Sequence, residues 1–238
     1  MHCTAVIPCL NEAGHVGSVV RNVLSYVQNV IVVDDGSSDR TPSEAMAAGA
    51  EVIRHETNMG KGAAIQTGLR RAAECGFEWA LLMDGDGQHA ASDIPLFLAA
   101  APAPLVIGDR MHNAAAIPWL RRFVNRWMSA RLSRRLGRRL PDTQCGYRLI
   151  HLPSWSRLEL QTSHFEIESE MVAAFVEAGY DVKFVPIQVI YKNESSKINP
   201  VIDTIRWFRW FWSSNTARRS QASADCSARP EEADAHAS

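Results

Sequence analysis

Short apolar runs alternate with segments of helical periodicity through the first half of the chain. The runs are rich in Val, Ile and Leu and occupy residues 4–8, 30–34, 51–55, 79–84 and 104–108. Apolar residues recur at helical spacing between them, over 12–27, 40–49, 60–75 and 92–101. Continuous apolar runs of this length are typical of parallel strands that are covered on both faces. The alternation predicts an α/β fold with a doubly wound, mostly parallel sheet.

The second half of the chain has a different pattern. Residues 110–141 contain no acidic residue, and eight arginines fall between Arg121 and Arg139. Apolar positions predict a basic amphipathic helix within 117–140, then a helix over 164–178 and a strand over 182–191. We expect 1–113 and 114–213 to be two halves of one domain. The remainder, 214–238, is poor in apolar residues and is predicted to be a disordered tail.

Composition narrows the class of protein. The 238 residues, 46% of them hydrophobic, are enough to bury a full core. The net charge of −1 creates no overall field for a polyanion, and no nucleic-acid-binding motif is present, so we expect no nucleic-acid partner. The five cysteines are scattered, without zinc-ligand spacing, which favours a reduced, cytoplasmic protein. No segment is typical of a signal peptide or a transmembrane helix.

Polar residues cluster where three of the predicted strands end, at 8–12, 34–39 and 84–89. Ligands of doubly wound sheets bind at the carboxyl ends of the strands, so the three clusters predict one site. In the third cluster, Asp84 and Asp86 flank Gly85, with Gln88 close behind. Two carboxylates and an amide suit Mg²⁺ or Mn²⁺, which completes its shell with substrate phosphates, and the glycine leaves room for a ligand. The alternative is a surface turn, because Asp-Gly is a common turn dipeptide.

Two other segments have chemical and structural interpretations. Asp34 and Asp35 end the second strand, where a carboxylate can accept hydrogen bonds from a base or a ribose. The following residues 37–39 are alternatively helix caps. The segment "NMGKGAAIQTG" (58–68) lacks the spacing of a P-loop. We expect its glycines to serve helix–sheet packing and Lys61 to be a cation near the phosphate site.

In combination, these segments resemble a known family. "IPCLNE" (7–12), "VVDDGSSDRT" (32–41), "NMGKGAAIQTG", "MDGDGQH" (83–89), "VIGDR" (106–110) and "DTQCGYRL" (142–149) follow the order seen in family 2 glycosyltransferases with the GT-A fold. The chain is similar to the branch that makes polyprenyl- or dolichyl-phosphate sugars. The resemblance covers about residues 3–200 and implies a GT-A-type sheet joined to an acceptor-side half with amphipathic helices.

The resemblance implies roles for individual residues. The donor nucleotide and its diphosphate would be bound by Pro8, Leu10, Glu12, Val33, Asp35, Lys61, Asp84, Gly85, Asp86, Gln88, Arg110 and Lys197. The metal would be held by Asp84, Asp86 and Gln88. The catalytic set would be Asp86, Asp142 and Arg148, the last two on the acceptor side. Leu10 and Tyr191 depart from the family, which usually has Tyr and Arg at these positions, and the C-terminal transmembrane helices of many members have no counterpart.

The predicted function is a metal-dependent, inverting transfer of a sugar from a UDP- or GDP-linked donor to a polyprenyl-phosphate-type lipid. The alternatives are transfer to a hydroxyl of a pigment, polyene or glycolipid, and a nucleotidyltransferase or a non-catalytic nucleotide-sugar-binding module. A hydroxyl acceptor needs a base. Asp142 is the first candidate and Glu168 the second, although the acidic residues of 166–170 are alternatively an exposed helix face.

The basic segment 117–140 and the aromatic segment 204–212 predict contact with a membrane surface. Arginines combined with Trp and Phe on a helix are typical of membrane interfaces, and core packing or oligomer contact is the alternative. We therefore expect a peripheral protein at the inner face of the membrane. The further partners that we consider are a membrane protein and a second copy of the chain.

Overall fold

The computed structural model describes residues 1–112, 117–190 and 204–213. Seven strands form one sheet in the order β3-β2-β1-β4-β6-β5-β7. Their bounds are β1 Cys3–Cys9, β2 Val30–Asp34, β3 Glu51–Arg54, β4 Trp79–Leu82, β5 Leu105–Asp109, β6 Arg148–His151 and β7 Val182–Pro186. All neighbouring strands pair in parallel except β6, which is antiparallel to both β4 and β5. The prediction of a mostly parallel sheet is confirmed.

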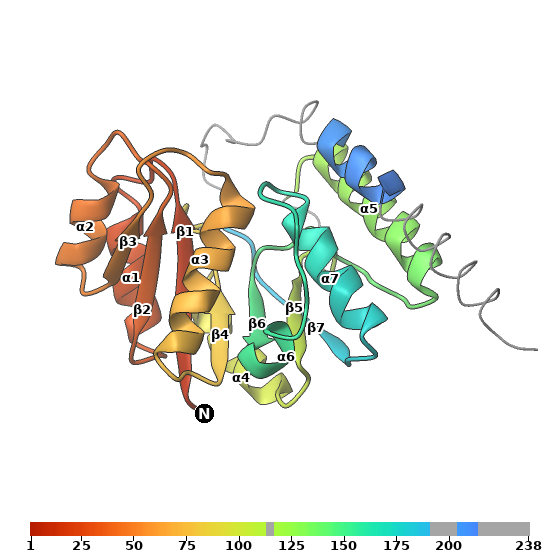
Figure 1. Cartoon of the computed structure of the whole chain (residues 1–238), viewed down its shortest axis with the longest axis horizontal. Coiled ribbons are helices and arrows are strands. Elements are labelled where there is room, and N and C mark those ends of the chain that lie inside the picture. Colours follow the sequence, from red (N-terminus) through yellow and green to blue (C-terminus); the bar gives the residue numbers. More distant parts are fainter. Residues whose placement is uncertain (113–116, 191–203, 214–238) are drawn as a thin grey trace, which may run out of the picture. The chain divides into compact units, whose positions relative to one another are not determined.

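The helices occupy the segments between the strands. Their bounds are α1 Val16–Leu24, α2 Thr41–Ala47, α3 Lys61–Glu74, η1 Ala91–Asp93, α4 Ile94–Ala100, α5 Trp119–Leu136, α6 Leu152–Trp155 and α7 Ile167–Glu177. One group, α3, α6 and α7, lies on the near face of the sheet in Figure 1, and α3 contacts both α6 and α7. The other group is α1, α2, η1 and α4, in which α1 contacts α2 and η1, and η1 contacts α4. Right-handed crossovers place α1 and α2 opposite α3, because the chain reverses its direction across the sheet after β3.

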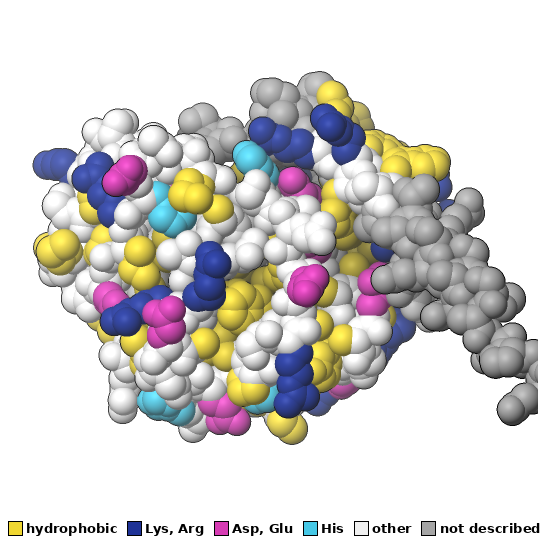
Figure 2. All heavy atoms as spheres, in the orientation of Figure 1, with side chains coloured by type: hydrophobic (Ala, Val, Ile, Leu, Met, Phe, Trp, Pro, Cys, Tyr) yellow, Lys and Arg dark blue, Asp and Glu magenta, His cyan; other side chains and the backbone are white. Residues whose placement is uncertain are grey.

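The core follows from the apolar strand runs. Strands β1, β2 and β4 are buried along their whole length, as expected for central strands covered on both faces. Helix α3 approaches this part of the sheet closely at Gly68, where a Cβ atom would collide with Val6. The packing role that we predicted for this glycine is confirmed. Figure 2 shows positive and negative side chains interspersed on the face that carries α3, as the small net charge predicts.

Within residues 1–190, the prediction missed one strand and one short helix. Strand β6 has only four residues and begins with an arginine, so its pattern gives little indication of a buried strand. Helix α6 follows it directly and is equally short. The strand β6 matters for the site, because it lies between the two parallel parts of the sheet and begins at Arg148.

The apolar residues of the predicted amphipathic helix α5 differ in burial between its two ends. Towards the C-terminus, Met128 and Leu132 are buried. Towards the N-terminus, Trp119, Leu120 and Phe123 are 73%, 54% and 64% exposed. The helix therefore packs onto the protein through its C-terminal half and presents large apolar side chains to the outside through its N-terminal half.

The described residues up to 190 belong to one compact unit, and residues 204–213 belong to a second. In the second unit, residues 204–213 are helical, and the rings of Trp207 and Phe211 stack with their centroids 5.0 Å apart. Within the described residues, no helix is long and apolar enough to cross a membrane. The predicted disordered tail, 214–238, and the predicted site residue Lys197 lie outside the described residues. The domain boundaries that we inferred from the sequence remain predictions.

Candidate active site

The three polar clusters lie at the ends of adjacent strands. The central part of the sheet runs β2-β1-β4, and the last residues of β1 and β2, Cys9 and Asp34, are paired. The segment that contains Asp84 leaves β4 on the other side of β1. The topology therefore brings together the residues that the sequence places about 25 and 50 positions apart.

The loop after β1 is held by side chains from the loop after β2. Ser37 accepts a hydrogen bond from the Asn11 N–H (2.8 Å), and Thr41 accepts one from the Glu12 N–H (2.7 Å). Asn11 has a positive φ of 52°, a backbone conformation that asparagine tolerates. The expectation that residues 37–39 cap the next helix holds only for Asp39, which accepts from the Thr41 N–H. Asp39 precedes the N-cap residue Arg40, whose own side chain makes no capping hydrogen bond, so the polar residues after β2 mainly hold the loop after β1.

Asp35 is buried and organises the start of α3. Its carboxylate accepts hydrogen bonds from the backbone N–H groups of Met59 (2.9 Å) and Gly60 (2.8 Å). The ring of His55 lies 2.7 Å from the same carboxylate and 3.1 Å from the hydroxyl of Thr67. A contact between Asp35 and a base or ribose remains a prediction. In this structure its carboxylate fixes the turn that leads to Lys61.

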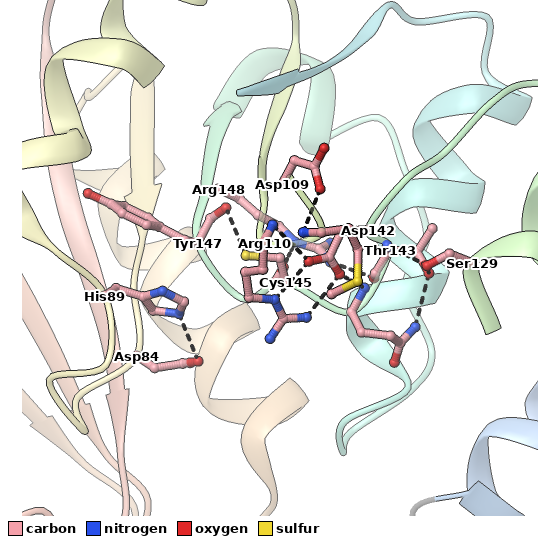
Figure 3. Close-up of polar contacts among 12 residues, drawn as sticks. Asp84, His89, Asp109, Arg110, Ser129, Asp142, Thr143, Cys145, Tyr147 and Arg148 are labelled. Atoms are coloured by element: carbon pink, nitrogen blue, oxygen red, sulfur yellow. Dashed lines mark hydrogen bonds and ion pairs between the residues drawn. The ribbon is translucent and has the colours of Figure 1, made fainter. Parts of the chain in front are cut away.

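The aspartate pair follows β4 in a turn, and its first member is tied to two other side chains. Oδ1 of Asp84 lies 2.7 Å from Nζ of Lys61, at the N-terminus of α3. Oδ2 of Asp84 lies 3.4 Å from Nε2 of His89, a contact shown in Figure 3. Asp86 accepts a hydrogen bond from the Gln88 N–H (2.9 Å). The predicted proximity of Lys61 to the aspartate pair is thus present.

Lys61 also contacts the second half of the chain. Its Nζ lies 2.7 Å from Oε1 of Glu168 on α7 and 5.4 Å from the ring centroid of Phe165. Glu168 is only 6% exposed, so the interpretation of its segment as an exposed helix face is wrong for this residue. Gly146 completes the enclosure, because a Cβ atom there would lie 2.8 Å from Oδ2 of Asp84 and 3.1 Å from Nζ of Lys61.

These contacts shift the pKa values of the two aspartates in opposite directions. Burial disfavours a charged Asp84, but Lys61 and then His89 outweigh it and hold the pKa of Asp84 well below its usual value. Burial and the neighbouring charge of Asp84 raise the pKa of Asp86. Burial opposes the charge of Lys61 too, yet Asp84 and Glu168 raise its pKa. The result is a fully ionised Asp84 beside an Asp86 whose ionisation would be favoured by a further cation.

The residues present fit a divalent cation that is shared with a substrate. Asp84 and Asp86 offer hard carboxylate oxygens, which Mg²⁺ and Mn²⁺ prefer. In the described part of the chain, no group of three or more His, Cys, Asp or Glu side chains could hold a metal alone. Magnesium usually binds one or two carboxylates and takes its remaining ligands from water and phosphate. Gln88, the third predicted ligand, adjoins the pair through its backbone contact to Asp86.

Arg110 and Asp142 form a bidentate ion pair at the end of β5. Nε and Nη2 of Arg110 lie 2.7 and 2.9 Å from the two carboxylate oxygens, as Figure 3 shows. The backbone N–H groups of Arg110 and Gln144 donate to the same carboxylate, each over 3.2 Å. The side chain of Asp142 is 0% exposed. Burial opposes the charge of Arg110, but Asp142 dominates and raises its pKa well above the usual value.

Arg148 lies in the interior, where its side chain binds backbone carbonyls. Its guanidinium donates to the carbonyls of Cys145 (2.8 Å), Glu168 (2.8 Å) and Thr143 (3.1 Å). The residue is 0% exposed, and burial lowers its pKa. A direct contact with an acceptor remains a prediction. In this structure Arg148 joins the 142–148 loop to the helix that carries Glu168.

The remaining predicted residues lie around the same edge of the sheet. Pro8 pairs with Val33 in the sheet register, and both are buried. Leu10 and Glu12 follow β1, and a Cβ atom at Gly85 would collide with Cys9. The sequence pointed to His89 only as part of a motif and left His55 and Gly146 unassigned. Their contacts depend on pairings across the fold that spacing along the chain does not give.

Comparison with known proteins agrees with this geometry. The family model for "Glycosyl transferase family 2" matches residues 4–154. The UDP-N-acetylglucosamine–dolichyl-phosphate N-acetylglucosaminyltransferase of Methanococcus voltae is 29% identical over 216 residues, covering 80% of this chain and 86% of that protein. The undecaprenyl-phosphate mannosyltransferase of Micrococcus luteus is 27% identical over 229 residues, covering 87% and 94%.

Solved structures show the same fold. Glucosyl-3-phosphoglycerate synthase from Mycobacterium tuberculosis, crystallised with Mn²⁺, uridine diphosphate and phosphoglyceric acid, superposes with a TM-score of 0.66 at 20% identity. The match covers 87% of this chain and 74% of that one. The predicted GT-A architecture is confirmed.

Proposed function

Because the chain belongs to glycosyl transferase family 2, we propose that it transfers a sugar from a nucleotide-diphosphate donor to a polyprenyl-phosphate-type lipid, with a divalent metal ion and inversion at the anomeric carbon. The enzyme is a glycosyltransferase, so the nucleotidyltransferase and the non-catalytic module are set aside. The named relatives that act on dolichyl or undecaprenyl phosphate support the lipid acceptor.

One observation favours a phosphate acceptor over a hydroxyl: both candidate bases are engaged in ion pairs. Asp142 is held by Arg110 in a bidentate contact and is fully buried. Glu168 is held by Lys61 at 2.7 Å. Oxygens that already accept hydrogen bonds from a cation are less available to accept a proton from an acceptor hydroxyl. A phosphate acceptor is already ionised and needs no base, whereas a hydroxyl acceptor does.

The chain's own residues would act mainly on the donor. Mg²⁺ or Mn²⁺ bound by Asp84 and Asp86, with Gln88 nearby, would offset the charge of the diphosphate. Lys61 adds a buried positive charge next to Asp84, and Asp35 fixes the turn from which Lys61 projects. An oxygen of the acceptor phosphate attacks the anomeric carbon opposite the diphosphate. The new carbon–oxygen bond forms as the old one breaks, and the diphosphate leaves with the electron pair, so no proton has to be transferred.

A transfer assay with purified protein tests the proposal. The reaction contains Mn²⁺, a panel of UDP- and GDP-sugars and a short-chain polyprenyl phosphate in detergent, with the matching polyprenol as the hydroxyl acceptor. We expect a metal-dependent product on the phosphate alone, and loss of the product in Asp86→Asn. A product on the polyprenol alone would move the acceptor to a hydroxyl. Absence of metal-dependent donor binding would contradict the assignment of the aspartate pair.

We further propose that the exposed N-terminal half of α5 contacts the membrane that contains the acceptor. Trp119, Leu120 and Phe123 are large, exposed and followed by arginines, a combination that suits the boundary between lipid chains and headgroups. Phe123→Ser should weaken binding to lipid vesicles. The control Met46→Ser removes a side chain of the same 64% exposure on α2 and should leave binding unchanged. Equal effects of the two substitutions would contradict the proposal.

A further inference from the structure

A basic cavity lies beside the C-terminal half of α5, apart from the aspartate pair. Its volume is about 810 Å³. The charged residues that line it are Arg126, Arg134, Arg138, Arg139 and Asp109. We call it the arginine cavity. None of the residues that contact the aspartate pair lines it, but Asp109 and Met111 flank Arg110 and Pro141 precedes Asp142, so the cavity lies next to the Arg110–Asp142 pair.

The chain turns sharply to bring these arginines together. Gly137 ends α5 with a φ of 65°, the left-handed conformation that a glycine adopts without strain. The turn returns the chain alongside the helix, and the Leu140 N–H donates to the hydroxyl of Ser133 (3.0 Å). Arg139 thereby joins Arg126 and Arg134 around one cavity.

The positive charge of the cavity is only partly compensated within the protein. Arg138 is paired with Asp181 at 3.0 Å, and Asp109 is the one acidic residue in the lining. Among the described residues, no hydrogen bond or ion pair is found for the side chains of Arg126, Arg134 or Arg139. Gathering like charges without acidic partners is unfavourable, so the arrangement favours binding of an anion. Guanidinium groups bind phosphate oxygens in a bidentate manner.

We propose that the arginine cavity binds the phosphate group of a membrane lipid. Positions 126, 130 and 134 follow Trp119 and Phe123 at helical spacing, so all five lie on one face of α5. Along this face, the exposed apolar residues come first and the residues that line the cavity follow towards the C-terminus. From Phe123 to Arg134 the helix rises roughly 16 Å. A phospholipid has a matching arrangement, in which an apolar chain is joined to a phosphate group. Basic pockets next to a membrane surface bind such anionic headgroups.

Vesicle binding by the full chain tests the site. The probes are vesicles of phosphatidylcholine alone, and of phosphatidylcholine with about 30 mol% phosphatidylglycerol or with a few per cent polyprenyl phosphate. We compare Arg134→Gln/Arg139→Gln with the control Arg70→Gln/Arg157→Gln, which removes two exposed arginines outside both the cavity lining and the basic segment 117–140. The cavity variant should lose about tenfold or more in affinity for the anionic vesicles, and the control about twofold or less. Equal losses in both variants, or no loss, would overturn the proposal.

Two further experiments distinguish a lipid phosphate from free phosphate and from the sugar-transfer reaction. Inorganic phosphate added in solution should stabilise the wild type against heat more than the cavity variant. If it does so while vesicle binding is the same in both variants, the anion site stands and the lipid source is wrong. Transfer to a short-chain acceptor in detergent reports the proposed function separately. Vesicle binding requires no sugar transfer, so failure of one experiment does not imply failure of the other.

Discussion

Lys61 and Glu168 form an ion pair of 2.7 Å between helices α3 and α7, although 107 positions separate them along the chain. The pair is largely buried, with the two side chains 15% and 8% exposed. It connects the half that carries the aspartate pair to the half that carries α7. Arg148 reinforces the connection, because its guanidinium holds the carbonyl of Glu168.

Glu168→Gln should therefore destabilise the fold. The substitution leaves Lys61 with Asp84 as its remaining acidic partner, and we expect the free energy of unfolding to fall by about 1–3 kcal/mol. Urea denaturation measures the change. Combining it with Lys61→Met in a double-mutant cycle isolates the coupling between the two residues. Glu166→Gln, on the same segment, is the control, and an equal loss there would contradict a specific role for the pair.

Asp84→Asn and Asp86→Asn should differ in stability while sharing a functional defect. Asp84→Asn removes the carboxylate that faces Lys61 and His89, so we expect a loss of about 1–3 kcal/mol. Asp86→Asn removes a charge that burial and Asp84 disfavour, so its stability should equal or exceed that of the wild type. Thermal unfolding with and without Mn²⁺ and uridine diphosphate measures both properties.

The added metal and nucleotide should stabilise the wild type, and neither variant should respond to them. A normal ligand-induced stabilisation of Asp86→Asn would show that Asp86 does not take part in metal binding. Equal stabilities of the two variants without ligand would contradict the electrostatic difference between the aspartates.

Arg148→Lys should destabilise the protein although it keeps the charge. Lysine lacks the planar fork that reaches the carbonyls of Thr143, Cys145 and Glu168 together, so at least one buried carbonyl loses its partner. We expect a loss of about 2–4 kcal/mol in urea denaturation. The control Arg157→Lys lies on the surface and should stay within about 0.5 kcal/mol. Normal stability with lost transfer would instead support contact between Arg148 and the substrate.

The sequence predicted the sheet better than the contacts within the site. Strands such as 30–34 were found because continuous burial leaves a continuous apolar run, and the strand-end rule brought Asp35 and Asp84 to one edge. Strand β6 was missed because an antiparallel strand of four residues has little periodicity. The Lys61–Glu168 pair could not be predicted, because long-range contacts depend on how the halves pack. Burial of Glu168 is likewise invisible in an acidic stretch that has the composition of a surface helix.

Alkylation should distinguish the cysteines of the folded protein. Burial raises the pKa of Cys3 and Cys145 to about 12, so both remain protonated thiols at pH 8.5. Cys75 is exposed, and Cys9 is buried. With iodoacetamide followed by peptide mass spectrometry, we expect rapid labelling of Cys75 and protection of Cys3, Cys9 and Cys145. Labelling of Cys145 at the rate of Cys75 in the folded protein would contradict the buried position of the 142–148 loop.

The same shifts give a pH dependence of stability. A thiol with a raised pKa keeps its proton in the folded protein, whereas the unfolded chain releases it above about pH 8.5. The unfolded state then binds fewer protons, so the free energy of unfolding falls as the pH rises from about 8.5 towards the folded value. Cys145→Ala and Cys3→Ala should reduce this alkaline loss, which urea denaturation at several pH values measures.

Asp142→Asn tests whether the acceptor needs a base. The substitution removes the carboxylate that binds Arg110 through two contacts, so we expect a stability loss of about 2–4 kcal/mol. If the acceptor is a phosphate, kcat of the folded variant should fall by less than about tenfold, with an unchanged pH profile, because no proton is abstracted. If Asp142 is a general base, kcat should fall by about 10²–10⁴-fold and the acidic limb of the profile should disappear. The second result would favour a hydroxyl acceptor, because an ionised phosphate has no proton for a base to remove.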